Sequence, residues 1–346
     1  VSIARSAGLL AMGRVFSGVV RIVLAVALAR WLGADDYGLY ILAVSLGFAA
    51  SGVASLGLDT AMERNAAVHS RRGDDPALRG SLQVGLGGTI LSALLVGGAL
   101  IVFADSVATG VFDEPDLVPL LEISAVLTPL LAVNTLLLAT LIGFKRMGEG
   151  TLASDFVQPM LRAVLLAALA IGGMTAYRAG VAITISYVAS TGLMAWMVTR
   201  VLRRGKGDQP ARRDYREIIA FAFPFWFAGM LRIVRTRLQP LLLGALGSVA
   251  NVGVFSVVTS ASTLGRIANL SINKALRPTL AQLHDSGDRS EIGRLYATTT
   301  RWTLSVNLPV FLLMVLLPDS LLALFGPGFD AGVSALVVVA FAELIN

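Results

Sequence analysis

Long apolar stretches alternate with short polar ones along the whole chain of 346 residues. A helix needs about 20 predominantly apolar residues to cross the hydrocarbon core of a bilayer. The short alternating segments that transmembrane strands produce do not occur in the sequence. The pattern therefore predicts an all-α polytopic membrane protein with about ten transmembrane helices. They are expected at residues 8–31, 38–58, 82–104, 117–144, 156–174, 181–202, 218–246, 252–272, 302–318 and 331–346.

Composition supports a membrane location and narrows the chemistry. Apolar residues make up 55% of the chain and charged residues only 14%. The absence of cysteine excludes disulfides, iron–sulfur clusters and thiol nucleophiles. The two histidines, His69 and His284, fall in polar stretches between the predicted spans and do not suggest a zinc site. We therefore expect no catalytic residue, no metal and no cofactor.

Basic residues are distributed unevenly among the loops. With the N-terminus in the cytoplasm, lysines and arginines collect after the second, fourth, sixth and eighth spans, whereas the loop at residues 105–116 is acidic. The positive-inside rule then predicts a multi-pass protein of the cytoplasmic (inner) membrane with a cytoplasmic N-terminus. The net charge of +6 lies in these loops and inside the spans, which argues against nucleic acid as a partner. Residues 61–79 and 274–301 are expected to form amphipathic helices on the inner face.

Several arginines lie within spans rather than between them. Arg232, Arg235 and Arg237 fall near the middle of the seventh span. An arginine at the centre of a spanning helix costs about 2.5–3.5 kcal/mol, so we expect a watery, protein-lined cavity beside these residues. Arg232 and Arg235 share one face, because they are three residues apart. Arg237 falls on a different face, where it could pair or point outward.

The first span carries a similar pair. Arg14 and Arg21 lie nearly two turns apart on one stripe. For Arg14 the alternative stays open that its side chain extends to the headgroups. Arg266 is a further candidate for the same cationic cavity.

Few acids lie within or beside spans. Asp59 lies at the inner end of the second span, and Asp155 begins the fifth. Each is a candidate for coupling transport to protons or sodium. We favour the alternative that they form ion pairs, with Arg64 or with Arg162.

The two halves of the chain resemble each other at a common offset. Arg21 falls on Arg235, and Leu32-Gly33 falls on Leu246-Gly247. Since six spans precede the repeat, both halves start on the same side, which predicts a parallel pseudo-repeat. We expect an N-terminal six-helix lobe at residues 1–202, a cytoplasmic linker at 203–216 and an incomplete C-terminal lobe of about four helices at 217–346. The complete protein would then have at least twelve spans.

Particular runs resemble a known family. Trp31-Leu32-Gly33, Tyr37-Gly38-Leu39-Tyr40 and Ser55-Leu56-Gly57-Leu58-Asp59 resemble the start of Wzx-type flippases for O-antigen and other polysaccharide repeat units. These belong to the multidrug/oligosaccharidyl-lipid/polysaccharide (MOP) exporter superfamily. Leu324-Phe325-Gly326 is similar to that family too. The resemblance covers essentially the whole chain through diffuse motifs.

The resemblance implies a fold and a function. It implies two lobes in a MATE-like V, with the first and seventh helices lining a central cavity. The implied substrate is a sugar repeat unit on an undecaprenyl-type diphosphate, moved by alternating access without chemistry on it. Arginine holds phosphate through bidentate hydrogen bonds, which suits a cavity lined by Arg14, Arg21, Arg232, Arg235 and Arg266. Membrane lipids and polysaccharide assembly proteins are the other expected partners.

Other functions stay open. A lipid-linked peptidoglycan precursor flippase would use the same chemistry. A MATE-like drug or cation antiporter should line its cavity with acids, whereas arginines dominate here. An integral-membrane glycosyltransferase or polymerase should show a large outer loop or a cluster of acidic catalytic residues, and the sequence has neither.

Overall fold

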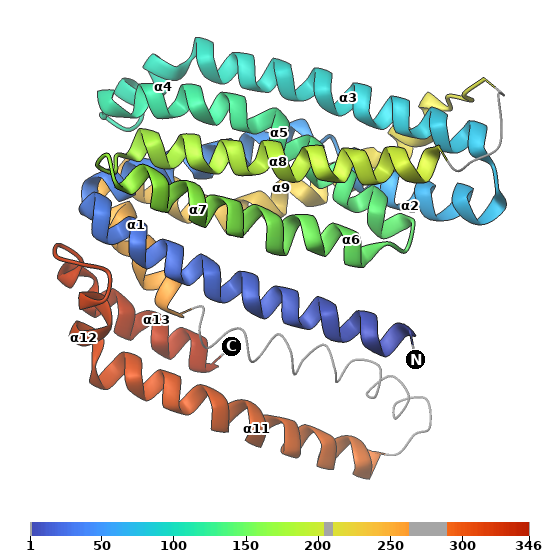
Figure 1. Cartoon of the computed structure of the whole chain (residues 1–346). Coiled ribbons are helices and arrows are strands. Elements are labelled where there is room, and N and C mark those ends of the chain that lie inside the picture. Colours follow the sequence, from blue (N-terminus) through green and yellow to red (C-terminus); the bar gives the residue numbers. More distant parts are fainter. Residues whose placement is uncertain (1, 204–209, 263–288, 346) are drawn as a thin grey trace. The chain divides into compact units, whose positions relative to one another are not determined.

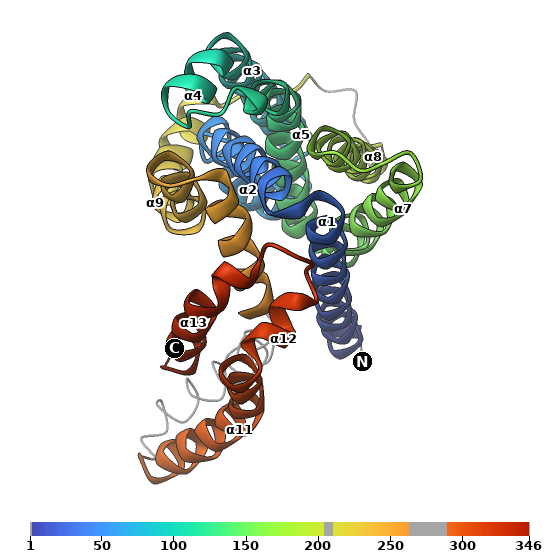
Figure 2. The ribbon, with the colours of Figure 1, turned by 90° about the vertical axis from the view of Figure 1, so that its left-hand side faces the viewer.

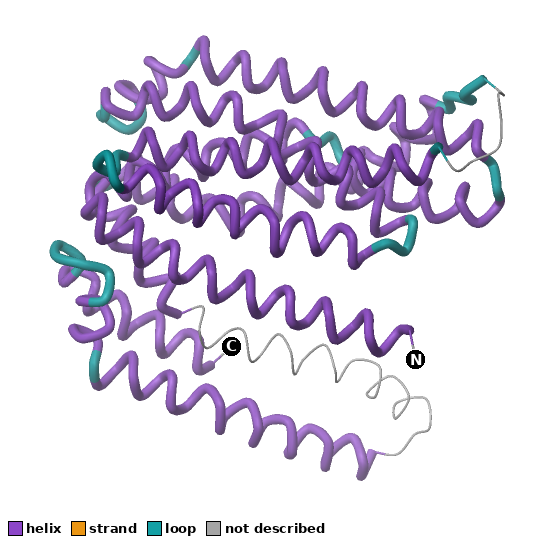
Figure 3. The backbone as a smooth tube through the Cα atoms, viewed as in Figure 1, coloured by secondary structure: helices purple, strands orange, loops and turns teal. Residues whose placement is uncertain are grey.

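The computed structural model describes residues 2–203, 210–262 and 289–345 (Figure 1). Helices joined by short loops make up this described part, and no strand occurs within it (Figure 3). Seven of the described helices are long and apolar enough to cross a membrane. The predicted all-α membrane fold is therefore confirmed, whereas the ten-span count and the parallel repeat stay predictions.

The chain divides into two compact units. The first contains residues 1–20 and 35–252, and the second contains residues 21–34 and 253–346. This division groups the seventh predicted span with the helices of the first half. The predicted lobes at residues 1–202 and 217–346, with the linker 203–216, stay a prediction.

Two helices that meet at Gly33 carry the first two predicted spans. Together they are labelled α1 (Ser2–Ala54), and Gly33 between them has a φ of 75° and a ψ of 179°, which are not helical. Glycine adopts such positive φ values readily, whereas other residues do so at a cost. The break expected between the first two spans thus lies at Gly33, where one helix ends and the next begins.

Helix α5 lies at the centre of the first unit. Seen end-on, its neighbours α2, α3 and α8 surround it (Figure 2). The chain of α5 is apolar on almost every side, and leucines such as Leu136, Leu137 and Leu141 are fully buried. A helix that is apolar all round is expected in the interior of a bundle. The helices of this group are α2 (Leu58–Arg72), α3 (Asp75–Val102), α5 (Val118–Gly143), α7 (Gln158–Ala170), α8 (Ala176–Leu202) and α9 (Tyr215–Leu246).

Shorter elements connect these helices. The loop after α3 holds α4 (Ala104–Gly110) and the 3₁₀ turn η1 (Pro115–Leu117). Helix α7 is preceded by α6 (Met147–Thr151) and a π-helical segment, η2 (Leu152–Val157). The helix Val249–Ser262 follows α9.

The second unit contains α11 (Arg289–Leu316), α12 (Pro318–Ala323), η3 (Asp330–Gly332) and α13 (Val333–Ile345). Helix α11 packs against α12 and α13. Arg30, from the α1 residues of this unit, donates its Nε–H to the carbonyl oxygen of Leu324 at 2.7 Å. This bond satisfies a carbonyl at the end of α12 that has no partner within the helix.

Three expected boundaries were wrong. The fifth span does not begin at Phe156, because α6, η2 and α7 form a helical stretch from Met147 that places Asp155 inside the π-helix. Residues 289–301 belong to the long helix α11 instead of a separate surface helix. The expected amphipathic helix at 61–79 is α2, which ends at Arg72 and packs its apolar side on α3 and α5. The segment 274–288 lies outside the described residues.

Gly57 fixes the junction between α1 and α2. Its φ is 71°, in the left-handed region, and α2 begins at the next residue. A Cβ atom on Gly57 would lie only 2.2 Å from the carbonyl oxygen of Ala222 on α9. Glycine is therefore needed here both for the turn and for the close approach of α9.

We predict that Gly57→Ala destabilises the protein by more than the roughly 1–2 kcal/mol that a left-handed alanine costs, because the methyl group also displaces α9. Chemical denaturation in detergent measures the effect. Gly98→Ala on α3 is the matched control, since open space surrounds that position. Equal stability of the two variants would contradict the tight α2–α9 contact.

Candidate functional site

One side of α9 is fixed by packing on the second half of α1. Trp226 donates its Nε1–H to the carbonyl oxygen of Val53 at 2.9 Å. Ile233 fills the space beside Gly52, where a Cβ would lie 2.3 Å from the isoleucine Cδ1, and Gly244 contacts Leu42. These α9 positions recur at spacings of seven or eleven residues, which return to the same side of a helix.

Arg232 and Arg235 lie on the other side of α9. Each residue turns about 100° around the axis, so these arginines lie about 120° and about 180° from the packed stripe. Both side chains are exposed in the described part of the chain. Together they would cost about 5–7 kcal/mol if they faced lipid. Their positions near the middle of a 32-residue helix leave little scope for reaching the headgroups.

Arg237 belongs to the packed side, contrary to the alternative that it points outward. Its guanidinium lies over the ring of Phe48, 4.3 Å from the ring centroid. Phe48 in turn contacts Tyr187 of α8 edge-on, with ring centroids 6.2 Å apart. The half-buried arginine thus ties α9 to α1 and α8 through a cation–π contact.

Arg21, Arg14 and Arg266 are the other predicted cavity cations. Arg21 is exposed on α1 and belongs to the second unit, whereas Arg235 belongs to the first. Their pairing across one cavity stays a prediction. Arg14 lies in α1, but its side chain is not among those described, and Arg266 lies outside the described residues.

The two acids occupy different settings. Asp59 is half-exposed in the first turn of α2. Arg64, one of its expected partners, instead contacts Glu217 of α9 at 3.2 Å and lies over Phe221, 4.6 Å from the ring centroid. Asp155 is half-buried in η2.

Arg162, the other expected partner, donates from Nη2 to the hydroxyl oxygen of buried Tyr40 at 2.5 Å. The roles of Asp59 and Asp155 in coupling or in structure both stay predictions.

Sequence reasoning missed a buried polar cluster next to η2. Asn134 of α5 donates to the hydroxyl oxygens of Ser190 and Thr191 at 3.2 and 3.0 Å. Ser190 donates to the carbonyl oxygen of Ala153, within η2, at 3.1 Å. A π-helical turn leaves backbone groups in need of partners, and this hydroxyl supplies one. The signal in the sequence is Asn134 itself, an amide inside a long apolar run.

Comparisons with known proteins agree with this architecture. A family described as polysaccharide biosynthesis protein matches residues 3–284. No curated protein sequence matches the chain.

Solved structures are similar over nearly the whole chain. An inward-facing multidrug resistance transporter of the MATE family, in the MOP superfamily, is 14% identical, with a TM-score of 0.63, over 94% of this chain and 81% of its own. A MOP superfamily transporter from Pyrococcus furiosus, noted for the reverse polarity of its binding pocket, is 15% identical, with a TM-score of 0.57, over 99% and 79%.

The MATE multidrug transporter DinF-BH, solved as a complex, is 18% identical, with a TM-score of 0.55, over 99% and 78%. At these identities the likeness shows a common fold. Together with the family match, it confirms the resemblance to MOP exporters stated from the sequence.

We predict that Arg237→Ala lowers the free energy of unfolding by about 1–2 kcal/mol, because a partly desolvated cation–π contact is lost. Arg232→Ala is the matched control, since it removes the same side chain from the exposed side of the same helix. Chemical denaturation in detergent compares the two. Equal losses would contradict the assignment of the two arginines to different sides of α9.

Proposed function

The chain belongs to the polysaccharide biosynthesis protein family, and we propose that it moves a lipid-linked oligosaccharide across the cytoplasmic membrane. The proposed cargo is a sugar repeat unit on an undecaprenyl-type diphosphate, carried from the cytoplasmic to the outer leaflet by alternating access. No bond of the cargo is made or broken. The proposed role is export for surface polysaccharide such as O-antigen.

The exposed pair Arg232 and Arg235 is the observation that carries this proposal. The pair lies on the side of α9 that the first unit leaves uncovered, near the middle of a spanning helix. A diphosphate crossing a bilayer needs cationic partners, and each guanidinium can hold phosphate oxygens through two parallel hydrogen bonds. The apolar tail of the cargo can stay in lipid while the headgroup passes these arginines.

The positive charge on the exposed side of α9 favours a diphosphate cargo over a cationic one. A drug or cation antiporter needs acids along its path, whereas this side of α9 presents two arginines. A peptidoglycan precursor flippase would carry the same diphosphate and fits the same pair. The two cargoes therefore differ in their glycan, and measuring surface polysaccharide distinguishes them.

We predict that Arg235→Ala impairs polysaccharide export while membrane insertion stays normal. Losing one charge-assisted contact costs about 1.5–3 kcal/mol, roughly a ten- to hundredfold loss in affinity for the diphosphate. Arg235→Lys should export an intermediate amount, because lysine keeps the charge but cannot hold two phosphate oxygens through parallel hydrogen bonds. Arg235→Glu should export least. Arg21→Ala should behave alike if Arg21 faces the same path.

The measurement is surface polysaccharide made by the full chain in a strain that lacks its own repeat-unit flippase, with protein amounts checked by blot. Arg216→Ala, at the exposed start of α9, is the control. Wild-type export by an Arg232→Glu, Arg235→Glu double variant would rule out this route. Rescue of a strain lacking the peptidoglycan precursor flippase, without rescue of surface polysaccharide, would assign the other cargo.

A further inference from the structure

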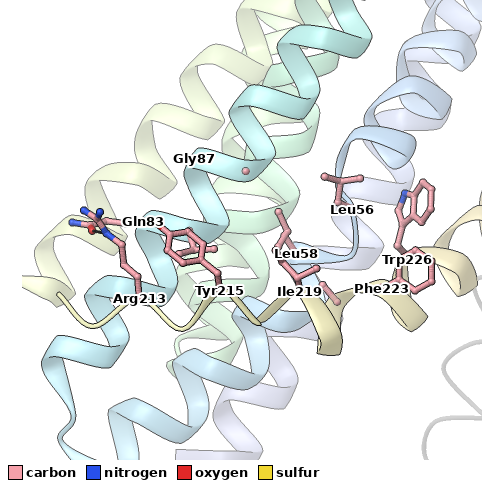
Figure 4. A pocket seen from close by; sticks show the side chains of 12 residues that line it. Leu56, Leu58, Gln83, Gly87, Arg213, Tyr215, Ile219, Phe223 and Trp226 are labelled. Atoms are coloured by element: carbon pink, nitrogen blue, oxygen red, sulfur yellow. Dashed lines mark hydrogen bonds between the residues drawn. The ribbon is translucent and has the colours of Figure 1, made fainter. Parts of the chain in front are cut away.

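A cavity of about 590 Å³ lies in the first unit, beside the starts of α2 and α9 and the first half of α3. Ligand sites typically measure about 300–1,000 Å³, so the cavity can hold part of a small molecule. The polar ends of Arg213 and Gln83 lie at one end of it, and the rings of Phe223 and Trp226 lie at the other (Figure 4). The wall between them is apolar and includes Leu58, Val84 and Ile219.

The position of Arg213 is fixed by the chain segment that precedes α9. The backbone N–H of Arg212 donates to the carbonyl oxygen of Pro76 at 2.9 Å. The side chain of Arg212 contacts Asp74, with Nη2 and Oδ2 2.9 Å apart. A Cβ on Gly80 would lie 1.9 Å from the carbonyl oxygen of Arg212, so only glycine lets this segment lie against α3.

The ionised form of Asp74 is stabilised by its hydrogen-bond partners. The backbone N–H of Ala77 donates to its carboxylate at 3.1 Å. This bond first, and then the Arg212 guanidinium, hold the pKa of Asp74 below its usual value. The attachment of the segment to α3 is therefore present at neutral pH.

The guanidinium of Arg213 differs from those of its neighbours. Arg212 contacts Asp74 and Arg64 contacts Glu217. Arg213 donates its Nε–H to the neutral amide oxygen of Gln83 at 2.9 Å, and within the described residues no carboxylate bonds it. A guanidinium has five N–H donors, so those on its terminal nitrogens remain for another acceptor. Asp214, the next residue in the chain, is exposed, and so is Arg216.

We propose that this cavity binds a resident anionic glycerophospholipid, with one acyl chain along the apolar wall and the phosphate on Arg213. An amphiphile fits a cavity that is cationic at one end and apolar at the other. A phosphodiester carries a single negative charge, which the single guanidinium of Arg213 matches. The site is separate from Arg232 and Arg235, and it does not depend on the proposed transport function.

Native mass spectrometry of the purified full chain tests this site. Dioleoylphosphatidylglycerol and dioleoylphosphatidylcholine are the probes, because they share their acyl chains and differ in net charge. Wild-type protein should retain phosphatidylglycerol about tenfold better, as expected for one charge-assisted contact. Arg213→Gln should abolish this preference, whereas Arg203→Gln, at another exposed arginine, should keep it.

Filling the cavity gives a second, independent test. A side chain at Gly87 would start in open space, so Gly87→Leu can occupy the cavity without a clash at its Cβ. This variant should retain neither lipid at the site. Gly98→Leu, on the same helix and also in open space, should behave as wild type. If Gly87→Leu does not fold, Ile219→Trp fills the cavity from α9.

Three results would overturn the proposal. They are an unchanged phosphatidylglycerol preference in Arg213→Gln, wild-type lipid retention in both filled variants, or displacement of bound phosphatidylglycerol by farnesyl diphosphate at equal concentration. The last result would assign the cavity to the transported lipid instead. Retention of phosphatidylglycerol by Arg235→Ala separates this site from the export route, whatever that variant exports.

Discussion

The cost of arginine in an apolar medium governs this structure. Two arginines near the middle of α9 require water, phosphate or protein beside them, since lipid would cost about 2.5–3.5 kcal/mol for each. Arg237, the third arginine near the middle of α9, is instead stabilised by packing, because it lies over Phe48 and becomes part of the bundle. The same helix thus has a side that builds the first unit and a side that this unit leaves exposed.

Glycines make the packed side possible. Because Gly52 has no side chain, Ile233 can pack against it. For the same reason, the backbone of α9 at Ala222 can approach Gly57 closely. Without a hydrophobic driving force between helices in lipid, such close approaches and the polar contacts that accompany them hold the bundle together. The Arg64–Glu217 pair and the bond from Trp226 to Val53 are contacts of this kind. With the close approaches at Gly52 and Gly57, they set the face on which Arg232 and Arg235 lie.

Apolar run length was sufficient to predict the fold class, and charge inside those runs was sufficient to single out Arg232 and Arg235. The sequence also placed a break between residues 31 and 38, and the structure has it at Gly33, where two helices meet. Contacts between segments that are distant in the chain could not be predicted from the sequence. Nothing local indicates that Arg212 docks beside Gly80, or that Arg64 contacts Glu217 instead of Asp59. The π-helical turn around Asp155 likewise accepts a hydrogen bond from Ser190, which is distant in sequence.

The central claim is that the arginine side of α9 lines a watery path for a diphosphate. Because the chain has no cysteine, single cysteines can be labelled selectively with a membrane-impermeant thiol reagent. Arg235→Cys should react, and a short prenyl diphosphate should slow the reaction while the matching prenyl alcohol does not. Leu95→Cys, exposed at an apolar position of α3, should stay unlabelled. An Arg235→Cys variant as unreactive as Leu95→Cys would contradict the account.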